Sequence, residues 1–270
     1  MNRYLYIGAH PDDADIQFSG TAMQLVAKGH KVKFVSVCNG DCGHYAMRGK
    51  ELADRRYAET QAAAKLVGVE EYQVLEHGDC ELEVTLPNRK EILRIIREFQ
   101  PDVVISHSLY DYHADHRNCG QLVQDAAYLV NVPMYCPEIP IPAKNPVFAI
   151  SYHRFTTPRP FRVDAAVEFD SVLEKKLQVL ACHVSQMEEW LPWDVGMKDE
   201  ALRGLTSEEK YNFLLREIAR FITAADRGRD ILTAAYGQEK ASQIKYAEAF
   251  EITEYGKQLS QEEFQALMLG

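Results

Sequence analysis

The stretch RYLYIGAHPDDADIQFSGTAMQLVAKG, residues 3–29, contains the pattern that decides the fold. Its apolar run from Tyr4 to Ile7 is typical of a buried strand, and a glycine and a polar cluster follow directly. Apolar residues then recur at helical spacing up to Gly29, a residue type that commonly ends helices. The segment therefore predicts a strand, a functional loop and a helix, in that order.

The same alternation continues along the N-terminal half of the chain. Further strands are predicted at Lys31–Cys38, Tyr72–Leu75 and Val103–Ser106, with helices between them. We expect Asn88 to cap the helix that precedes the last of these strands. Strands and helices that alternate at this spacing predict an α/β fold with a Rossmann-like, mostly parallel β-sheet sandwiched by helices.

The second half of the chain departs from this alternation. Seven of the 11 prolines lie between residues 133 and 160, which excludes a regular helix there. Capping boxes that start at Thr206 and Ser260 each predict the beginning of a helix. We expect one domain, residues 1–270, with a Rossmann-like core at 1–130, a Pro-rich insertion folded over one sheet edge at 131–165, and a helical C-terminal part at 166–270.

Composition narrows the class of protein. The chain has 30 Lys and Arg against 40 Asp and Glu, a formal charge of −10, which disfavours nucleic acid as a partner. The sequence shows neither a signal peptide nor an apolar run long enough for a membrane span. Its six scattered cysteines form no C-x-x-C pair and indicate reduced thiols. We expect a cytoplasmic protein that acts on a small molecule.

Two polar clusters follow the ends of predicted strands. In parallel sheets the carboxyl ends of the strands form the edge where ligands bind. For the first cluster alone, a simpler interpretation is that its carboxylates cap the next helix and its histidine lies in a turn. Two clusters at one edge favour a metal site instead, built from His10, Asp12 and Asp13 in the first and His113, Asp115 and His116 in the second.

These residue types suit metal-assisted hydrolysis. Two histidines and one aspartate form a ligand set of the kind that catalytic zinc uses while one coordination position stays open for water. A carboxylate and a histidine are then left over for proton transfer and charge stabilisation. The pattern is typical of a metal hydrolase.

The motifs Ala9–Asp13 (AHPDD) and His113–His116 (HADH) resemble those of the PIG-L, or LmbE-like, zinc-dependent N-deacetylases. Looser similarities extend over nearly the whole chain, although Ala14 stands where the family often has Glu. They include Gly20-Thr21, residues 39–43, Arg56-x-x-Glu59, Gly78-Asp79, residues 101–104, His183-x-Ser185-Gln186 and residues 247–250.

The resemblance implies a role for each matching residue. It implies one Zn²⁺ per chain, or another divalent metal, bound by His10, Asp13 and His116. The remaining roles are Asp12 as general base, His113 as the group that supports the transition state, Asp115 as the residue that orients a histidine, and Arg56, Asp79 and His183 as substrate-binding residues. We further expect Asp115 to raise the pKa of the neighbouring His113.

The expected reaction is hydrolysis of an N-acetyl amide, with an N-acetylglucosamine-type sugar as substrate. An aspartate-nucleophile phosphatase using Asp13 and Asp15 is one alternative, but it leaves the second cluster unused. A non-catalytic sugar-binding protein of the same fold is another, but it needs neither the spare carboxylate nor the spare histidine. The aglycone and the roles of Asp15, Trp190 and Trp193 stay open, and a homo-oligomer is compatible with these features.

Overall fold

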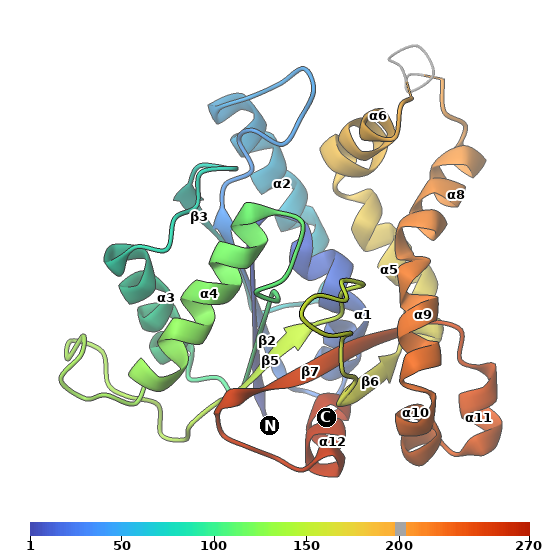
Figure 1. Cartoon of the computed structure of the whole chain (residues 1–270). Coiled ribbons are helices and arrows are strands. Elements are labelled where there is room, and N and C mark those ends of the chain that lie inside the picture. Colours follow the sequence, from blue (N-terminus) through green and yellow to red (C-terminus); the bar gives the residue numbers. More distant parts are fainter. Residues whose placement is uncertain (198–203) are drawn as a thin grey trace.

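The computed structural model describes residues 1–197 and 204–270. At its centre these residues form a seven-stranded sheet with the order β3-β2-β1-β4-β5-β7-β6 (Figure 1). The strands are β1 Arg3–Gly8, β2 Lys31–Cys38, β3 Glu71–His77, β4 Val103–Ser106, β5 Val147–Ser151, β6 Ala165–Glu168 and β7 Ala247–Gly256.

The sheet is mostly parallel, as the sequence predicts. The first five strands pair in parallel, and β7 runs antiparallel to both of its neighbours. Residues Tyr4 to Ile7 of β1 are fully buried because helices cover both faces of the sheet at its centre. The expected Rossmann-like fold class is therefore confirmed.

Helices form a layer on each face of the sheet (Figure 1). One face packs against α3 and α4 through Leu5 and Ile7, and the other packs against α1, α2 and α12 through Tyr4 and Tyr6. The helices are α1 Asp13–Ala27, α2 Lys50–Val67, α3 Leu86–Phe99, α4 Ala114–Leu129, α5 Leu173–Ala181, α6 Leu191–Asp194, α8 Ser207–Ile218, α9 Arg220–Arg227, α10 Arg229–Tyr236, α11 Gln238–Gln243 and α12 Gln261–Leu269. The 3₁₀ turn η1 spans Asp170–Val172, and the π-helical turn η2 spans Ser185–Trp190.

The predicted cap of α3 is wrong by three residues. Thr85 is the N-cap, and its hydroxyl accepts a hydrogen bond from the backbone N–H of Asn88 at 3.3 Å. Pro87 lies in the first turn of the helix, where a missing N–H costs nothing, so the helix begins before Asn88. The capping boxes at Thr206 and Ser260 are confirmed.

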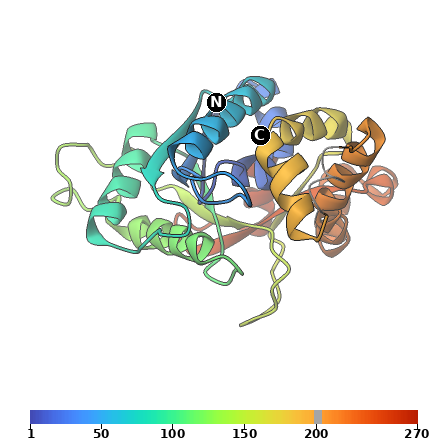
Figure 2. The ribbon, with the colours of Figure 1, turned by 90° about the horizontal axis from the view of Figure 1, so that it is seen from above.

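The expected division of the domain needs correction. Strand β5 lies inside the proline-rich stretch but occupies the sheet between β4 and β7, because its apolar residues are covered on both faces. Strands β6 and β7 come from, or extend into, the part expected to be helical. Within the stretch expected as the insertion, residues 131–146 and 152–164 lie outside the sheet, and Figure 2 shows the second of these, the β5–β6 loop, projecting from the body of the molecule.

A buried ion pair joins α1, α5 and β7. The ammonium of Lys176 lies 2.6 Å from Glu248 Oε1, and neither side chain is exposed. Glu248 also accepts hydrogen bonds from the backbone N–H groups of Gly20 and Thr21 at 2.9 and 2.7 Å. This pair fixes the helix that follows the first polar loop against the sheet.

Across the described residues, the helices are too short or too polar for a membrane crossing.

Candidate metal centre and catalytic cavity

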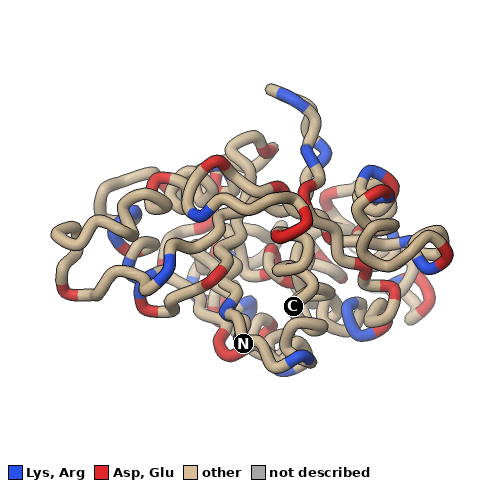
Figure 3. Tube along the Cα trace, turned by 90° about the horizontal axis from the view of Figure 1, so that it is seen from below, with Lys and Arg blue, Asp and Glu red and all other residues tan. Residues whose placement is uncertain are grey.

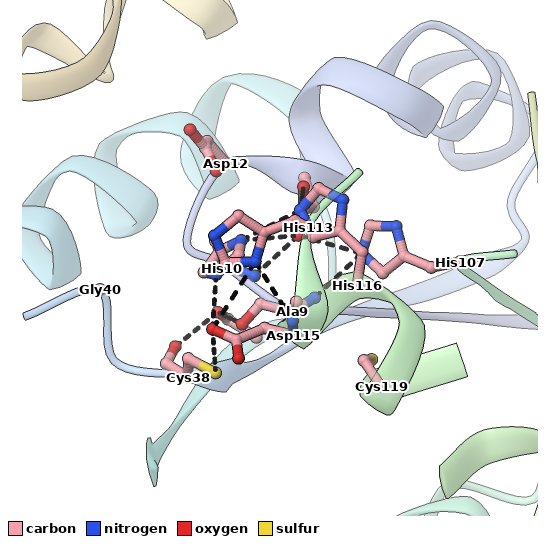
Figure 4. A network of polar contacts seen from close by, with 12 residues as sticks. Ala9, His10, Asp12, Cys38, Gly40, His107, His113, Asp115, His116 and Cys119 are labelled. Carbon is pink, nitrogen blue, oxygen red and sulfur yellow. Dashed lines mark hydrogen bonds and ion pairs between the residues drawn. The ribbon is translucent and has the colours of Figure 1, made fainter. Parts of the chain in front are cut away.

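The two polar clusters meet because β1 and β4 are neighbours in the sheet. The loop after β1 carries His10, and the loop after β4 leads to His116 in the first turn of α4. Their ring nitrogens, His10 Nδ1 and His116 Nε2, lie 3.1 Å apart although 106 residues separate them in the chain (Figure 4). The site thus lies at the carboxyl edge of the parallel strands.

Donor atoms of His10, Asp13 and His116 lie within 4 Å of one another in pairs. The distance from His116 Nε2 to Asp13 Oδ1 is 3.4 Å, and that from His10 Nδ1 to Asp13 Oδ2 is 3.7 Å. Three N and O donors at zinc-ligand distances in a tetrahedral arrangement would lie roughly 3.4 Å from one another. His10 and His116 also form a potential ligand group with His113, and Asp13 and His116 form one with His107. The residues present therefore fit a divalent metal.

Each of the three potential metal ligands also contacts a further polar side chain. Asp111 Oδ1 lies 2.9 Å from His116 Nδ1, and Asp115 Oδ2 lies 3.1 Å from His10 Nε2. Carboxylates in these positions orient metal-binding histidines and fix which ring nitrogen faces the metal. His107 Nε2 lies 3.0 Å from Asp13 Oδ2, which leaves Oδ1 of Asp13 directed toward His116.

The charges in this cluster are strongly coupled. Burial raises the pKa of Asp13, but His116 and His107 outweigh it and hold that pKa well below its usual range. Burial lowers the pKa of His10, but hydrogen bonds to Asp115 and Asp79 outweigh it and raise the pKa to about 10. Without a metal, a proton on His10 therefore compensates the surrounding carboxylates.

Asp12 lies beside the metal-type cluster but takes no part in it. It is the N-cap residue of α1, yet its side chain makes no capping hydrogen bond, so the capping interpretation of its carboxylate is wrong. Its Oδ1 lies 3.4 Å from the guanidinium of Arg56. Figure 4 draws Asp12 apart from the histidines, with no dashed line joining it to them. The Asp12 carboxylate lines the cavity.

His113 differs from the expectation for its pKa. Its Nδ1 accepts a hydrogen bond from the backbone N–H of Asp115 at 3.2 Å and caps α4, while the Asp115 carboxylate lies 3.9 Å away and contacts His10 instead. Burial and the nearby His10 lower the pKa of His113, so the expected rise is wrong. A neutral His113 with Nδ1 accepting carries its proton on Nε2.

The three expected substrate-binding residues fall into two groups. Arg56 and Asp79 line the cavity and lie 3.3 Å apart, and Asp79 also contacts His10 Nε2 at 3.0 Å. His183 is fully buried and lies 2.8 Å from Asp15 beneath α1. Because His183 is closed off from the cavity, the structure contradicts direct contact of this residue with substrate.

The cavity over the site has a volume of about 710 Å³, enough for a sugar derivative. Residues from four other segments complete its wall. Trp190 lines it and stacks on Trp193 with ring centroids 5.4 Å apart. Other wall residues, which the motif analysis does not single out, are Tyr112, Tyr152, His153, Arg154, Phe155, Glu217 and Arg220.

The fold and the site define a class of protein. A Rossmann-like sheet with a His-Asp-His donor set at its carboxyl edge, and with a spare carboxylate and histidine in the same cavity, is the framework of a metal-dependent hydrolase. Comparison with known proteins gives the family. Residues 5–127 match the model described as PIG-L: GlcNAc-PI de-N-acetylase.

Known relatives agree with this match. A diacetylchitobiose deacetylase of Thermococcus kodakarensis is 31% identical over 211 residues, 75% of this chain and 77% of that protein. A 4-oxalmesaconate hydratase of Pseudomonas putida is 26% identical over 194 residues, 69% of this chain and 74% of that protein. The structure of an N,N'-diacetylchitobiose deacetylase from Pyrococcus horikoshii, complexed with an inhibitor, has a TM-score of 0.68 at 25% identity and covers 93% of this chain and 84% of that one. The chain belongs to the PIG-L family of LmbE-like N-deacetylases.

The two motifs do not include two supporting residues of the centre. Asp111 and His107 lie in the same strand-end segment as the HADH motif, and both are close to the donor set. Their proximity to the motif was the available signal. A one-dimensional pattern does not show which polar residues of a loop turn inward, because that depends on the neighbouring strand.

Proposed function

We propose that this protein is a zinc-dependent N-deacetylase that removes acetate from an N-acetylglucosamine-type sugar or glycoconjugate. The observation that carries the proposal is the separation of roles within one cavity. His10, Asp13 and His116 have metal-ligand spacing, while Asp12 and His113 line the same cavity outside that triad. A binding protein would need the first group but not the second.

We assign one zinc ion per chain to His10 Nδ1, Asp13 Oδ1 and His116 Nε2. When bound, zinc supplies Lewis-acid polarisation of the amide carbonyl and favours ionisation of water at neutral pH. The hydrogen bonds that His116 donates to Asp111 and His10 donates to Asp115 keep the two ligand nitrogens directed to one point.

Asp12 is the general base of this proposal. Its carboxylate accepts a proton from the attacking water, and the ion pair with Arg56 positions the group at the cavity wall. Arg56 is itself held by Asp79, so the three side chains form one side of the site. Arg56 and Asp79 both line the cavity, and guanidinium and carboxylate groups suit the hydroxyl groups of a sugar.

His113 stabilises the reaction on the opposite side of the carbonyl. With Nδ1 occupied by the backbone N–H of Asp115, Nε2–H is the remaining donor, and it can donate to the developing oxyanion. The same proton can pass to the leaving amine, which needs one before the C–N bond breaks.

The phosphatase alternative loses support from the position of Asp15. That side chain has no exposed surface and pairs with the buried His183, so it cannot act as a second carboxylate in the cavity. The deacetylase relatives favour the amide reaction. The hydratase relative is the reason to test the amide reaction directly.

The test is a mass-spectrometric screen for loss of one acetyl group from N-acetylated sugars. The zinc-loaded protein should release acetate from at least one N-acetylglucosamine derivative, and the chelated protein should not. Aryl phosphate hydrolysis, assayed in parallel, should be absent. Binding of acetylated sugars without turnover by fully zinc-loaded protein would contradict the proposal and favour the non-catalytic alternative.

A further inference from the structure

The cavity wall contains a guanidinium, that of Arg220, which lies over the ring of Phe221 at 5.3 Å but has no carboxylate partner at ion-pair distance among the described residues. Arg220, the first residue of α9, lines the cavity and is partly buried. Its Nε is shielded from solvent yet has no hydrogen-bond partner. Among residues 1–197 and 204–270, no carboxylate lies within ion-pair distance of this side chain.

Other enclosed cations of the described chain have carboxylate or carbonyl partners. Lys33 and Lys176 pair with glutamates at 2.7 and 2.6 Å, and Arg56 pairs with Asp79 and Asp12. Arg97 has no carboxylate but donates to six backbone carbonyls, those of Leu129, Val130, Val132, Tyr135, Cys136 and Ile139. A shielded cation without such partners costs free energy unless something else satisfies it.

Arg154 adds a second free positive charge on the same wall. It lies in the projecting β5–β6 loop, where Figure 3 shows several Lys and Arg positions in blue. The other two arginines of that loop have carboxylate partners, since Arg159 pairs with Glu251 and Arg162 with Asp164. No hydrogen bond or ion pair joins Arg154 to another described residue, and its charge adds a smaller effect to burial, the main cause of the lowered pKa of Arg220.

The acidic residues of this wall do not neutralise the two arginines. Burial lowers the pKa of Arg220, and Glu217, one turn before it, partly offsets this effect, but Glu217 makes its ion pair with Arg216, at 3.5 Å and outside the cavity wall. Asp194 also lines the cavity and is exposed to water. Neighbouring His153 contributes a further shielded nitrogen, Nδ1, that has no partner.

Arg220 and Asp79 line the same cavity near different histidines of the metal centre. The ring of Tyr112 packs against His116 with centroids 5.4 Å apart, and the charge of Arg220 lowers the pKa of that phenol, although burial, the larger effect, raises it. Arg220 is therefore near the His116 side, whereas Asp79 contacts His10. A substrate bound across the centre would meet sugar-binding groups at one end and free cations at the other.

We propose that Arg220 and Arg154, with His153, form an anion-binding subsite, and that the substrate is an N-acetylated sugar carrying a carboxylate or phosphate group. This inference rests on the proposed deacetylase function and names the substrate class. Guanidinium groups bind both anions through paired N–H donors, so the shared chemistry is a small oxyanion.

The test compares a neutral substrate with anionic ones. Values of kcat/KM are measured for the methyl glycoside of N-acetylglucosamine, for N-acetylglucosamine 1-phosphate and 6-phosphate, and for the glycoside of N-acetylglucosamine with glycolic acid. The wild-type protein should have its highest kcat/KM for a phosphate substrate or for the carboxylate substrate. Comparing these two kinds of substrate identifies the anion that the subsite binds. Arg220→Gln should lower kcat/KM for the preferred anionic substrate by about 10- to 100-fold, and for the neutral one by a much smaller factor.

Matched variants separate charge from structure. Arg220→Lys keeps the charge but loses the paired donors, so its loss should be intermediate. Arg216→Gln removes an exposed arginine just before α9 and should change kcat/KM for neither substrate. Arg154→Gln alters an exposed loop residue, so it tests the subsite even where Arg220→Gln does not fold.

A binding readout is needed because phosphate can also bind zinc. Calorimetry on metal-free protein should show tighter binding of glucosamine 6-phosphate or 1-phosphate than of glucosamine, and Arg154→Gln should weaken that difference. Equal loss for neutral and anionic substrates in both arginine variants would overturn the subsite, as would the absence of any anion preference in wild type. If no acetylated sugar is hydrolysed, the proposed function fails, and the metal-free binding data still decide the subsite.

Discussion

Removing the carboxylate of Asp111 should weaken zinc binding without touching a ligand. Asp111 Oδ1 lies 2.9 Å from His116 Nδ1, and only 12% of the Asp111 side chain is exposed, so water replaces this contact poorly. Loss of such a supporting carboxylate costs about 10- to 100-fold in metal affinity, or about 1.4 to 2.8 kcal/mol. Asp111→Asn keeps an oxygen acceptor and belongs at the lower end, and Asp111→Ala belongs at the upper end.

The assay is competition for zinc with a chromophoric chelator, which gives an apparent Kd for each variant. Asp125→Asn is the matched control, because Asp125 pairs with Arg89 at 2.6 Å on α4, away from the cavity. The backbone N–H of His113 also donates to Asp111, so circular dichroism and a thermal melt must show that each variant is folded. An unchanged Kd in folded Asp111→Ala would refute the assignment of His116 as a supported zinc ligand.

Three further outcomes follow from the same contacts. Asp12→Asn should lower kcat by about 100-fold or more while zinc content stays at the wild-type level, and near wild-type turnover would show that another group is the base. Because the pKa of His10 is raised to about 10, a proton must leave this residue before zinc binds, so apparent zinc affinity should strengthen as pH rises, by up to about tenfold per pH unit. Chelator competition at several pH values measures the apparent zinc affinity. An affinity that does not change with pH would contradict this prediction. Glu248→Gln should destabilise the fold by about 3–5 kcal/mol in urea unfolding, because it leaves Lys176 charged and buried. Adding Lys176→Met should recover much of that loss, and failure to recover it would mean that Glu248 acts mainly through its backbone hydrogen bonds.

Local patterns in the sequence were enough to predict the parallel core and the two polar clusters that it brings together. The apolar run of β1 and the spacing of α1 lie within a few residues of each other, so their periodicity is readable without a partner. The capping boxes at Thr206 and Ser260 are equally local, since each closes within three residues. The matching motifs then gave the family, which the comparisons confirm.

Tertiary structure decided what depends on distant neighbours. Strand β5 could not be predicted from its proline-rich surroundings. Its place in the sheet depends on the neighbouring strands β4 and β7, which are distant in sequence. His113 lies next to Asp115 in sequence, yet the start of α4 turns that carboxylate toward His10, and the pKa of His113 falls instead of rising. The free charge of Arg220 is likewise invisible in sequence, because pairing is set by which side chains the fold brings within a few ångströms.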